Sequence, residues 1–376
     1  MESFSEPVAI DMGLEPDVVP GVLACGPARG ATGCCWARLE YLLWWQGGQS
    51  LPPLVTTSPA GTEQVDAGVL GLDSTSVLLG DGTLGRQARP GGRLTIGMLL
   101  DPCGGHAVEG RFFSLGKQTA ALDFESSAEG SPILARPFLD GDAQAARLVG
   151  YPGFWAPGTV HVQSETEVLG GDALCRWLVG RSGTTSVDLL AGYHFARIDG
   201  RLLIEDWSVA VDVPLVDPGT TLQIADDFSA RNEFHAGQIG MAIQHERAGW
   251  RLELLAKVAL GSMHETVTIT GRTTTITPPP DSETAQQGYG LLAQGANLGR
   301  HARSEFAVSP EVGLRCIWQL SPCALASLGY SYVHWSNVAL PAQQIDPQLL
   351  VPTRSFAIRD SSYWAHGLNA GFEFRF

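Results

Sequence analysis

The stretch "WAHGLNAGFEFRF", Trp364–Phe376, alternates between two kinds of side chain up to its last residue. Its even positions are mostly apolar and end on three phenylalanines. Its odd positions are small at first and then charged, at Glu373 and Arg375. Successive side chains of a β-strand point to opposite faces, so this period of two predicts a strand with one apolar and one polar face.

The same alternation recurs along the chain. It is found in "CWARLEYLLWW" (35–45), "SVDLLAGYHFA" (186–196), "WRLELLAKVALG" (250–261) and "FAVSPEVGLRCIWQL" (306–320). On a helical wheel the apolar residues of 250–261 would occupy every side and its charges would scatter. A strand instead gathers Arg251, Glu253 and Lys257 on one face.

These patterns predict about twelve strands, each close to the roughly 9–11 residues that a tilted membrane strand requires. The expected strands are Cys35–Gln46, Arg93–Leu100, Ala107–Gly116, Val160–Glu167, Ala173–Val179, Ser186–Ile198, Arg201–Val213, Phe234–Glu246, Trp250–Thr270, Glu305–Gln319, Ala324–Trp335 and Ser362–Phe376.

The connections between the expected strands alternate in length. Tight turns are predicted at Asp199–Gly200, at Arg247–Gly249 and at "LSP" near Ser321. Long links, many of them rich in Pro and Gly, are expected at Gly47–Gly92, Lys117–Thr159, Gly271–Ser304 and Asn337–Ser361. Short turns on one rim and long loops on the other are typical of outer-membrane barrels.

Composition limits the alternatives. The chain has 376 residues, a net charge of −15 and no run of basic residues, which argues against a nucleic-acid partner. No window approaches the roughly 18 unbroken apolar residues of a membrane helix. A soluble β-sandwich also alternates, but it could not hold charges repeatedly on one face of its strands if that face were its interior.

Aromatic residues near the strand ends, among them Tyr41, Trp45, Tyr193 and Trp318, suit the level of lipid headgroups. We therefore expect an all-β fold, a single closed antiparallel transmembrane β-barrel with long loops on one rim. The barrel is expected over residues 34–376, after a flexible N-terminal arm over residues 1–33.

If the aromatic face touches lipid, the opposite face lines the interior. The expected lumen-lining residues are Arg38, Glu40, Glu109, Arg111, Arg251, Glu253, Lys257, Glu311, Arg315, Glu373 and Arg375. Their mixed signs favour a ladder of salt bridges over an ion filter of one sign. Two hypotheses remain open: the charges plug a narrow barrel, or they line a narrow channel.

The last strand is expected to close against the first, because an unpaired strand edge is costly in lipid. Phe372, Phe374 and Phe376 then lie on its outer face. This end resembles the C-terminal strands of outer-membrane proteins, which the barrel-assembly machinery recognises.

Residues for chemistry are sparse. Asp226–Asp227 in "IADDFSARNEF", followed by His235, is the best candidate for a catalytic rim site, but adjacent aspartates in a loop are usually solvated. A calcium site with Asn232 lacks the twelve-residue loop pattern. We expect no catalytic residues, no metal and no cofactor.

The chain has seven cysteines and no CxxC pair, which argues against a zinc site. Cys316 and Cys323 flank an expected hairpin turn. They form either a disulfide or two packed thiols.

Several stretches after Cys35 carry a family resemblance. They are "WARLEYLLWW" (Trp36–Trp45), "VDLLAGYHFARID" (Val187–Asp199), "LLAQGANLGRHARSEFAVSPEVGL" (Leu291–Leu314), "GYSYVHWSNVALPAQQID" (Gly329–Asp346) and "RDSSYWAHGLNAGFEFRF" (Arg359–Phe376). Together they resemble the BBP7 family of outer-membrane β-barrel proteins, known mainly from planctomycetes. The resemblance implies a Gram-negative outer membrane and brings no catalytic residues. A secretory signal is expected there, but "MESFSEPVAIDMGLEPDVV" at the start lacks a basic region.

Three functions follow as hypotheses. The first is a porin-like or structural outer-membrane barrel that allows at most narrow passive diffusion. The second is a surface scaffold, in which the barrel is an anchor in lipid and the long loops bind an envelope protein. The third is a hydrolase at the rim. The sequence gives no oligomeric state and no solute.

Overall fold

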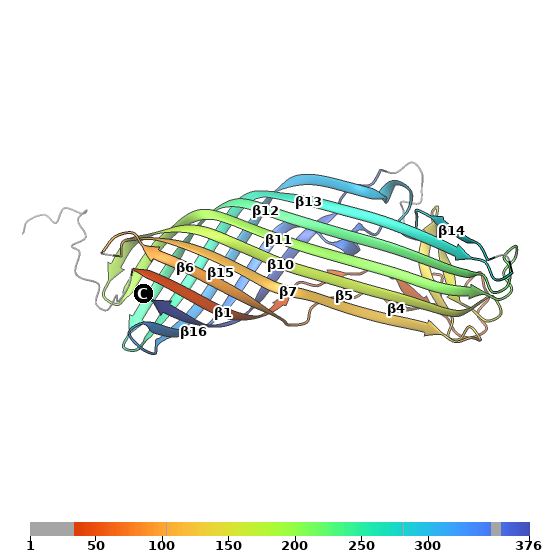
Figure 1. Cartoon of the computed structure of the whole chain (residues 1–376), viewed down its shortest axis with the longest axis horizontal. Helices are drawn as coiled ribbons and strands as arrows, with labels where there is room; N and C mark the ends of the chain where they lie inside the picture. The colour runs from red at the N-terminus through yellow and green to blue at the C-terminus, as the bar shows by residue number, and fades with distance from the viewer. Residues whose placement is uncertain (1–33, 103, 281, 347–354) are drawn as a thin grey trace, which may run out of the picture.

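The computed structural model describes residues 34–102, 104–280, 282–346 and 355–376, and the expected arm over residues 1–33 lies outside them. The described chain is built almost entirely of antiparallel β-strands (Figure 1). The long strands are β1 (Cys35–Gln46), β6 (Arg89–Leu99), β7 (His106–Ser126), β10 (Trp155–Ser182), β11 (Thr185–Ala210), β12 (Thr221–Arg247), β13 (Trp250–Ile276), β15 (Gly299–Gln319), β16 (Ala324–Ala339) and β17 (Asp360–Arg375).

These strands pair in a ring. The eleven-stranded sheet runs β12-β11-β10-β7-β6-β1-β17-β16-β15-β13-β14, and β12 also pairs with β13. Short β14 (Thr284–Gln287) pairs only with β13, so it stands outside the ring. The last strand, β17, pairs with the first, β1, from Trp36 opposite Arg375 to Gln46 opposite Ala365.

The ring contains ten strands where about twelve were expected. Val160–Glu167 and Ala173–Val179 are parts of one strand, β10, and Ser186–Ile198 and Arg201–Val213 fall on β11. The turn predicted at Asp199–Gly200 is therefore wrong. Both residues lie inside β11, where Asp199 is opposite Glu167 on one side and Arg231 on the other.

The other turn predictions are confirmed. β12 ends at Arg247 and β13 begins at Trp250, while β15 ends at Gln319 and β16 begins at Ala324. These short turns share one rim with the turn between β10 and β11, and the long connections leave from the opposite rim. The arrangement matches the expected division into short turns and long loops.

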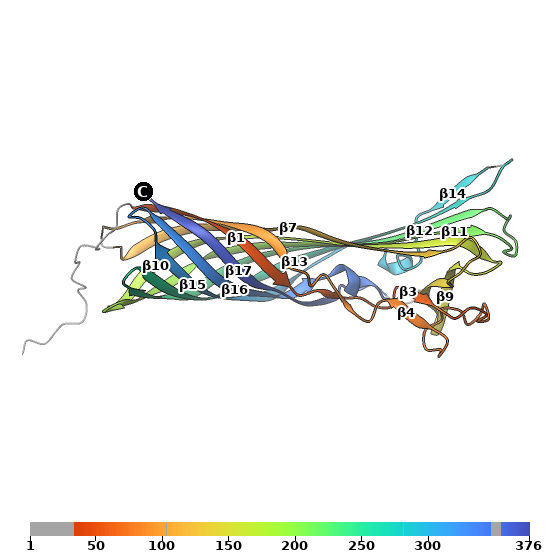
Figure 2. The same ribbon diagram turned by 90° about the horizontal axis from the view of Figure 1, so that it is seen from below.

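The ring strands differ greatly in length. β10 to β13 have 28, 26, 27 and 27 residues, whereas β1 and β6 have 12 and 11. The long strands therefore continue past the ends of the short ones as a curved sheet, which we call the extension (Figure 2).

The long connections cover the inner side of the extension. They contain a pair formed by β2 (Gln49–Ser50) and β5 (Thr83–Leu84), and two short 3₁₀ helices, η1 (Gly295–Asn297) and η2 (Pro341–Gln344). They also contain a four-stranded sheet in the order β4 (Ser76–Leu79), β3 (Val55–Thr57), β8 (Leu134–Asp140) and β9 (Ala143–Gly150). Buried Leu54, Leu134, Ile204, Phe228 and Ile269 join the connections and the wall strands in one apolar core.

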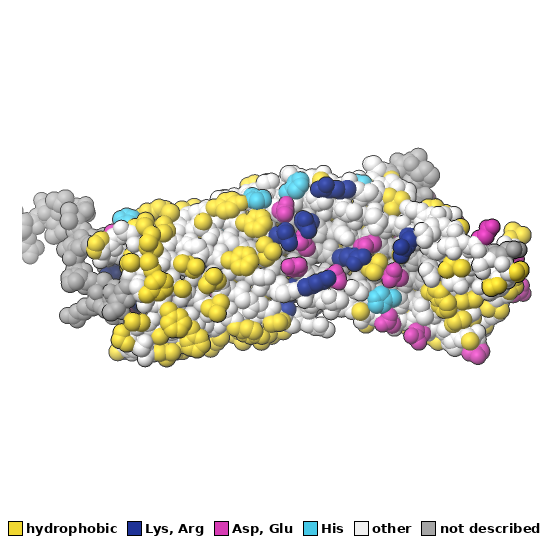
Figure 3. Space-filling model, in the orientation of Figure 1, with side chains coloured by type: hydrophobic (Ala, Val, Ile, Leu, Met, Phe, Trp, Pro, Cys, Tyr) yellow, Lys and Arg dark blue, Asp and Glu magenta, His cyan; other side chains and the backbone are white. Residues whose placement is uncertain are grey.

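The outward face near the short-turn rim is an apolar belt, densely yellow in Figure 3. Exposed large apolar side chains include Trp177, Leu189, Ile239, Leu254, Leu314, Leu328, Phe372, Phe374 and Phe376. On β10 the outward apolar positions run from Val179 to Leu169, and on β13 from Trp250 to Leu260, after which outward charged or polar residues follow. These runs match the roughly 9–11 residues of a tilted membrane strand.

Beyond the belt, the outward face carries ion pairs across neighbouring strands. Asp199 lies 3.0 Å from both Arg197 and Arg231, and Arg201 contacts Asp227 at 2.6 Å. A band of basic and acidic side chains accordingly crosses the middle of the molecule (Figure 3). The outer surface thus changes from apolar to charged part-way along each long strand.

Candidate functional site in the barrel interior

The inward face at the level of the belt is charged, and the strand register pairs its opposite charges. Asp172 lies opposite Arg111, Lys257 opposite Glu311, and Glu253 opposite Arg315. Arg38 on β1 is likewise flanked by Glu373 on β17. Directly opposed side chains on neighbouring strands lie close enough to interact, so the alternation itself builds the ion pairs.

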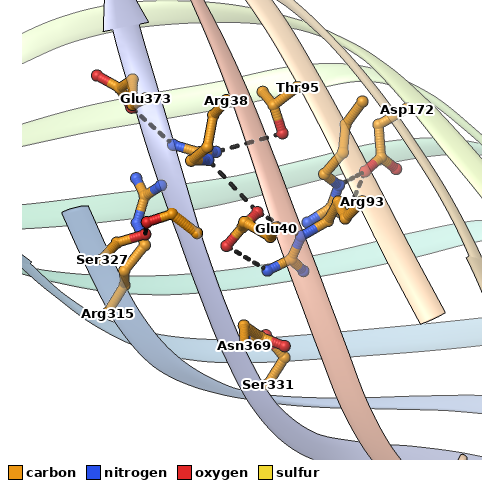
Figure 4. Close-up of polar contacts among 12 residues, drawn as sticks. Arg38, Glu40, Arg93, Thr95, Asp172, Arg315, Ser327, Ser331, Asn369 and Glu373 are labelled. Atoms are coloured by element: carbon orange, nitrogen blue, oxygen red, sulfur yellow. Dashed lines mark hydrogen bonds and ion pairs between the residues drawn. The ribbon is translucent and has the colours of Figure 1, made fainter. Parts of the chain in front are cut away.

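The first group of ion pairs centres on Arg38 and Glu40 (Figure 4). Arg38 donates to Glu373 at 3.2 Å and also lies 3.4 Å from Glu40. Arg93 donates to both oxygens of Glu40, at 2.7 and 2.9 Å. This bidentate geometry is the strong form of an arginine–carboxylate pair.

A second group surrounds Asp172, which is buried. Lys257 lies 3.1 Å from Asp172 and 3.0 Å from Glu311. Arg111 contacts Asp172 and donates to both oxygens of Glu311 at 2.6 Å each. The other carboxylate oxygen of Asp172 lies 2.6 Å from His194 Nδ1 and accepts a hydrogen bond from Gln238.

The third group centres on Glu253 and Arg176. Arg315 donates to Glu253 at 2.7 Å, and Arg176 lies 3.9 Å away from the same carboxylate. Arg176 also pairs with Asp188 at 2.7 Å and with Glu109 at 3.5 Å. Every carboxylate in the three groups therefore faces at least one cation, and the signs alternate through the interior.

The expected lumen-lining residues all lie on inward positions or at the rim. Arg38, Glu40, Arg111, Glu253, Lys257, Glu311 and Glu373 are buried. Glu109 and Arg315 are partly buried within the third group. Arg251 and Arg375 lie nearer the rim, where Arg251 contacts Glu246 and Arg375 contacts Glu373.

Sequence reasoning missed several members of these groups: Arg93, Asp172, Arg176, Asp188, His194 and Gln238. Asp172 fell between two expected strands that are in fact one. The alternation of Val168, Gly170, Asp172, Leu174 and Arg176 would have placed it inward had that stretch been taken as continuous.

Little free space remains among the charges. A cavity of about 50 Å³ is lined by members of all three groups, together with Leu174, Leu255 and Asn369. One water needs roughly 10–15 Å³ of such space, so the cavity has room for a few waters and is too small for an organic ligand.

An apolar layer fills the interior on the side of the charged groups that faces the extension. Trp44, Phe113, Phe234, Trp335 and Tyr363 are buried there in one cluster. Trp44 donates to Asn369 at 2.7 Å, and Asn369 donates to Ser331, which joins the apolar layer to the cavity below it. Buried side chains therefore lie directly next to the charged groups on the side that faces the extension.

The described start of the connection between β16 and β17, residues 340–346, folds inward beside the apolar layer, and we call it the inward-folded segment. The Asn232 side chain donates to the carbonyls of Ile198 and Ala339 and accepts from the Ala339 N–H. Gln49 accepts from the Ala342 N–H at 3.1 Å. The second cavity, beside Pro341, measures about 20 Å³, so this inward-folded segment leaves room for about one water.

The candidate rim site takes a different form from the one expected. Its residues lie within β12 and not in a loop, and the side chains of Asp226 and Asp227 point to opposite faces. Asp226 is fully buried, contacts Arg136 and accepts from the Leu292 and Ala293 N–H groups. Asp227 instead pairs outward with Arg201, so the two carboxylates do not converge.

The remaining candidate ligands also lie apart. His235 sits on the outward face of β12 beside Tyr193, and Asn232 holds the inward-folded segment. Cys316 and Cys323 are free thiols, and Cys316 lies opposite Leu328, so the hairpin does not bring the two sulfurs together. No group of three or more potential metal ligands occurs within the described ranges.

A family model described as "Putative beta barrel porin-7 (BBP7)" matches residues 36–376. The chain belongs to the BBP7 family. This agrees with the resemblance of the five stretches named above, and with the outer-membrane-type barrel fold. None of the helical segments in the described part of this BBP7 chain could span a membrane.

The BBP7 chain is also similar to solved structures. Outer membrane protease OmpT of Escherichia coli shares 10% identity over 92% of this chain and 97% of its own, with a TM-score of 0.43. The translocator domain of autotransporter NalP from Neisseria meningitidis shares 9% over 93% and 91%, with a TM-score of 0.26. The P. putida toluene transporter TodX shares 9% over 92% and 90%, with a TM-score of 0.23. No curated protein matches the chain.

Proposed function

We propose that this BBP7 chain is a structural outer-membrane barrel with an occluded interior, which anchors the extension and its loops beyond the membrane. The single observation that carries the proposal is the filled interior. Arg111 reaches from β7 across to Glu311 on β15, and the apolar layer and the inward-folded segment lie above them. A solute would have to displace all three to pass.

The outer surface supports insertion in lipid. The apolar belt ends where the ion pairs of Asp199 and Asp227 begin, as a boundary between hydrocarbon and headgroups requires. The pairing of β17 with β1 removes the strand edge that lipid cannot solvate. By analogy with other outer-membrane barrels, the short-turn rim faces the periplasm and the extension faces outward.

A porin-like role remains the second candidate, limited to narrow passive diffusion. The charged groups and their cavity of about 50 Å³ favour it, since the cavity lining carries both signs of charge. It requires the apolar layer to open. The proposal assigns no catalytic step to the chain, since the two aspartates of the candidate rim site do not converge.

Planar-bilayer conductance tests the proposal. The purified full chain is first shown to insert, by co-flotation with liposomes and by heat-modifiable migration in detergent gels. We expect no steady conductance steps from the inserted wild-type barrel, while a water-filled porin in the same bilayers gives them. Steady steps that change with Arg111→Ala but not with the outward variant Arg231→Ala would show an open lumen and overturn the proposal.

A further inference from the structure

An open groove lies at the far end of the extension, beside β9. Its volume is about 790 Å³, against about 50 and 20 Å³ for the two cavities inside the barrel. Ligand sites commonly measure roughly 300–1,000 Å³, so the groove has the size to receive a partner. Figure 2 shows β3, β4 and β9 together at this end, beneath the extended wall strands.

One side of the groove is a strand edge. β9 is the last strand of its four-stranded sheet, and among the described residues β8 is the strand that it pairs with. Ala143–Leu148 of β9 line the groove, and of these Ala143 is exposed and Ala145 and Ala146 are partly exposed. Unpaired N–H and C=O groups on such an edge are a template for another extended chain.

The groove walls carry polar side chains that the fold does not use. Glu63 and Gln64 come from the loop before β4, and Asp140 and Gln144 flank the hairpin between β8 and β9. None of these four side chains has a hydrogen bond or ion pair within the described residues. Tyr151 donates to the Thr62 carbonyl at 2.9 Å, so the loop that carries Glu63 is held in place.

The basic residue that lines the groove does not neutralise these carboxylates. Arg147 lies 2.9 Å from Asp206 and donates to Ser208 at 2.9 Å. Its guanidinium also lies 5.6 Å from the centre of the Trp155 ring. The charge of Arg147 is therefore already matched, and Glu63 and Asp140 leave the groove negative.

Aromatic rings form the other side. Phe154 and Trp155 meet edge to face at 6.1 Å, and both line the groove. Trp155 is buried and its ring already faces Arg147, so the partly exposed ring of Phe154 is the one left to contact the methylene stem and charged head of an incoming lysine or arginine. The strand edge favours an extended backbone, and the carboxylates and the aromatic side favour basic side chains on it.

We propose that the groove binds an extended polypeptide segment containing lysine or arginine, which adds to the sheet as a strand beside β9. Backbone pairing supplies the affinity, and Glu63 and Asp140 select the basic side chains. A second copy of this chain fits poorly, because its own Glu63 and Asp140 would face the same carboxylates across a two-fold interface. The inference rests on the proposed anchoring function, which places this end outside the membrane.

Fluorescence anisotropy with labelled peptides tests the inference on the full chain in detergent micelles. The first probe is a heptapeptide of alternating lysine and threonine. The second carries the same side chains but is N-methylated at alternate backbone amides on its pairing edge, which blocks strand addition without changing charge. The third replaces lysine by glutamate. We expect saturable binding of the first probe alone.

Two variants of the chain test whether carboxylates in the groove, and not the overall negative charge of the protein, drive binding. Glu63→Gln/Asp140→Asn should weaken binding of the lysine peptide about fivefold, the effect of losing two exposed ion pairs. The control Asp73→Asn/Glu125→Gln removes two exposed carboxylates outside the groove and should leave binding unchanged.

Three results of the peptide titrations would overturn the inference: no saturable binding, equal binding of the N-methylated peptide, or equal weakening by the control variant. A dimer that forms without peptide and is altered by Glu63→Gln/Asp140→Asn would also overturn it, in favour of a second copy. Conductance tests the proposed function separately. A barrel that does not conduct and binds no peptide would overturn only this inference, whereas a barrel that conducts would overturn the anchoring function.

Discussion

Arg111 and Glu311 are two hundred residues apart, lie on strands that are not neighbours in the ring, and form a bidentate ion pair with both hydrogen bonds at 2.6 Å. The guanidinium spans the interior from β7 to β15, so side chains alone bridge the barrel at this level. Asp172 and Lys257 complete a compact cluster of two cations and two anions. These four side chains therefore link β7, β10, β13 and β15 across the interior.

Removing Glu311 should destabilise the barrel strongly. In Glu311→Ala, Arg111 and Lys257 are left to share Asp172, and the buried cluster gains a net positive charge. Breaking a buried ion pair costs about 3–5 kcal/mol of unfolding free energy. The free energy of unfolding in urea, measured in detergent or lipid, tests this.

The matched control is Arg231→Ala, which removes an exposed pair with Asp199 and should cost less than about 1 kcal/mol. Replacing both partners, as Arg111→Met/Glu311→Leu, should cost less than Glu311→Ala because no unpaired charge is created. Equal costs for Glu311→Ala and Arg231→Ala would contradict a buried, coupled network.

The two-residue period predicted the membrane-level half of the fold well. Where one face is apolar, as from Trp250 to Leu260, the alternation predicts both that the segment is a strand and which of its faces points outward. Beyond the belt the phase reverses, because the outward face becomes polar while the inward face becomes largely apolar, as at Leu202, Ile204 and Val267. Asp199–Gly200 has the residues of a tight turn, but it marks the level where β11 leaves the apolar belt and its outward side chains become ion-paired.

The layers above the charges could not be predicted, since they come from segments distant in sequence. Asn232 holds Ala339, and Asp226 holds the backbone of Leu292 and Ala293. Neither contact has a local pattern, because each pairs one polar side chain with the backbone of a remote loop. The stretch "YVHWSNVALPAQQID" carries the family resemblance, but it was expected only to lead into a long loop, and nothing in it indicates that the segment folds inward.

A charge on the outward face should be costly inside the belt and tolerated above it. Leu254→Arg lies near the middle of the belt on β13 and should destabilise the barrel by about 2–4 kcal/mol in lipid. Thr268→Arg lies on the same outward face of the same strand, beyond the belt, and should cost less than about 1 kcal/mol. Unfolding titrations in liposomes measure both, and equal costs would place the membrane boundary elsewhere.

Asp226 should stabilise the extension without affecting the barrel below. Burial alone would lower the pKa of Arg136, but Asp226 and Asp206 beside it more than compensate and raise that pKa. Asp226→Asn leaves the buried guanidinium with weaker pairing, so the β8–β9 hairpin and the loop at Leu292 should loosen. Limited proteolysis and hydrogen exchange detect this, while heat-modifiable migration stays unchanged.

Asp227→Asn is the matched control for that variant. It changes the neighbouring aspartate, which faces outward in a partly exposed pair with Arg201, and should leave exchange in the hairpin unaltered. If the two variants loosen the hairpin equally, the buried contact of Asp226 with Arg136 does not hold the extension.

The pair of His161 and Asp123, on the outward face of the extension, should make stability depend on pH. The hydrogen bond that His161 donates from Nδ1 to the Asp123 carboxylate, at 2.5 Å, raises the pKa of His161 above its ordinary value. A raised histidine pKa contributes stability that is fully present below the unfolded pKa of about 6.5 and is lost as pH rises through the folded pKa. Wild type should therefore exceed Asp123→Asn in stability at about pH 5.5 and lose that advantage near pH 9. Urea midpoints at the two pH values measure the difference, with Glu125→Gln on the same strand as the control that shows none.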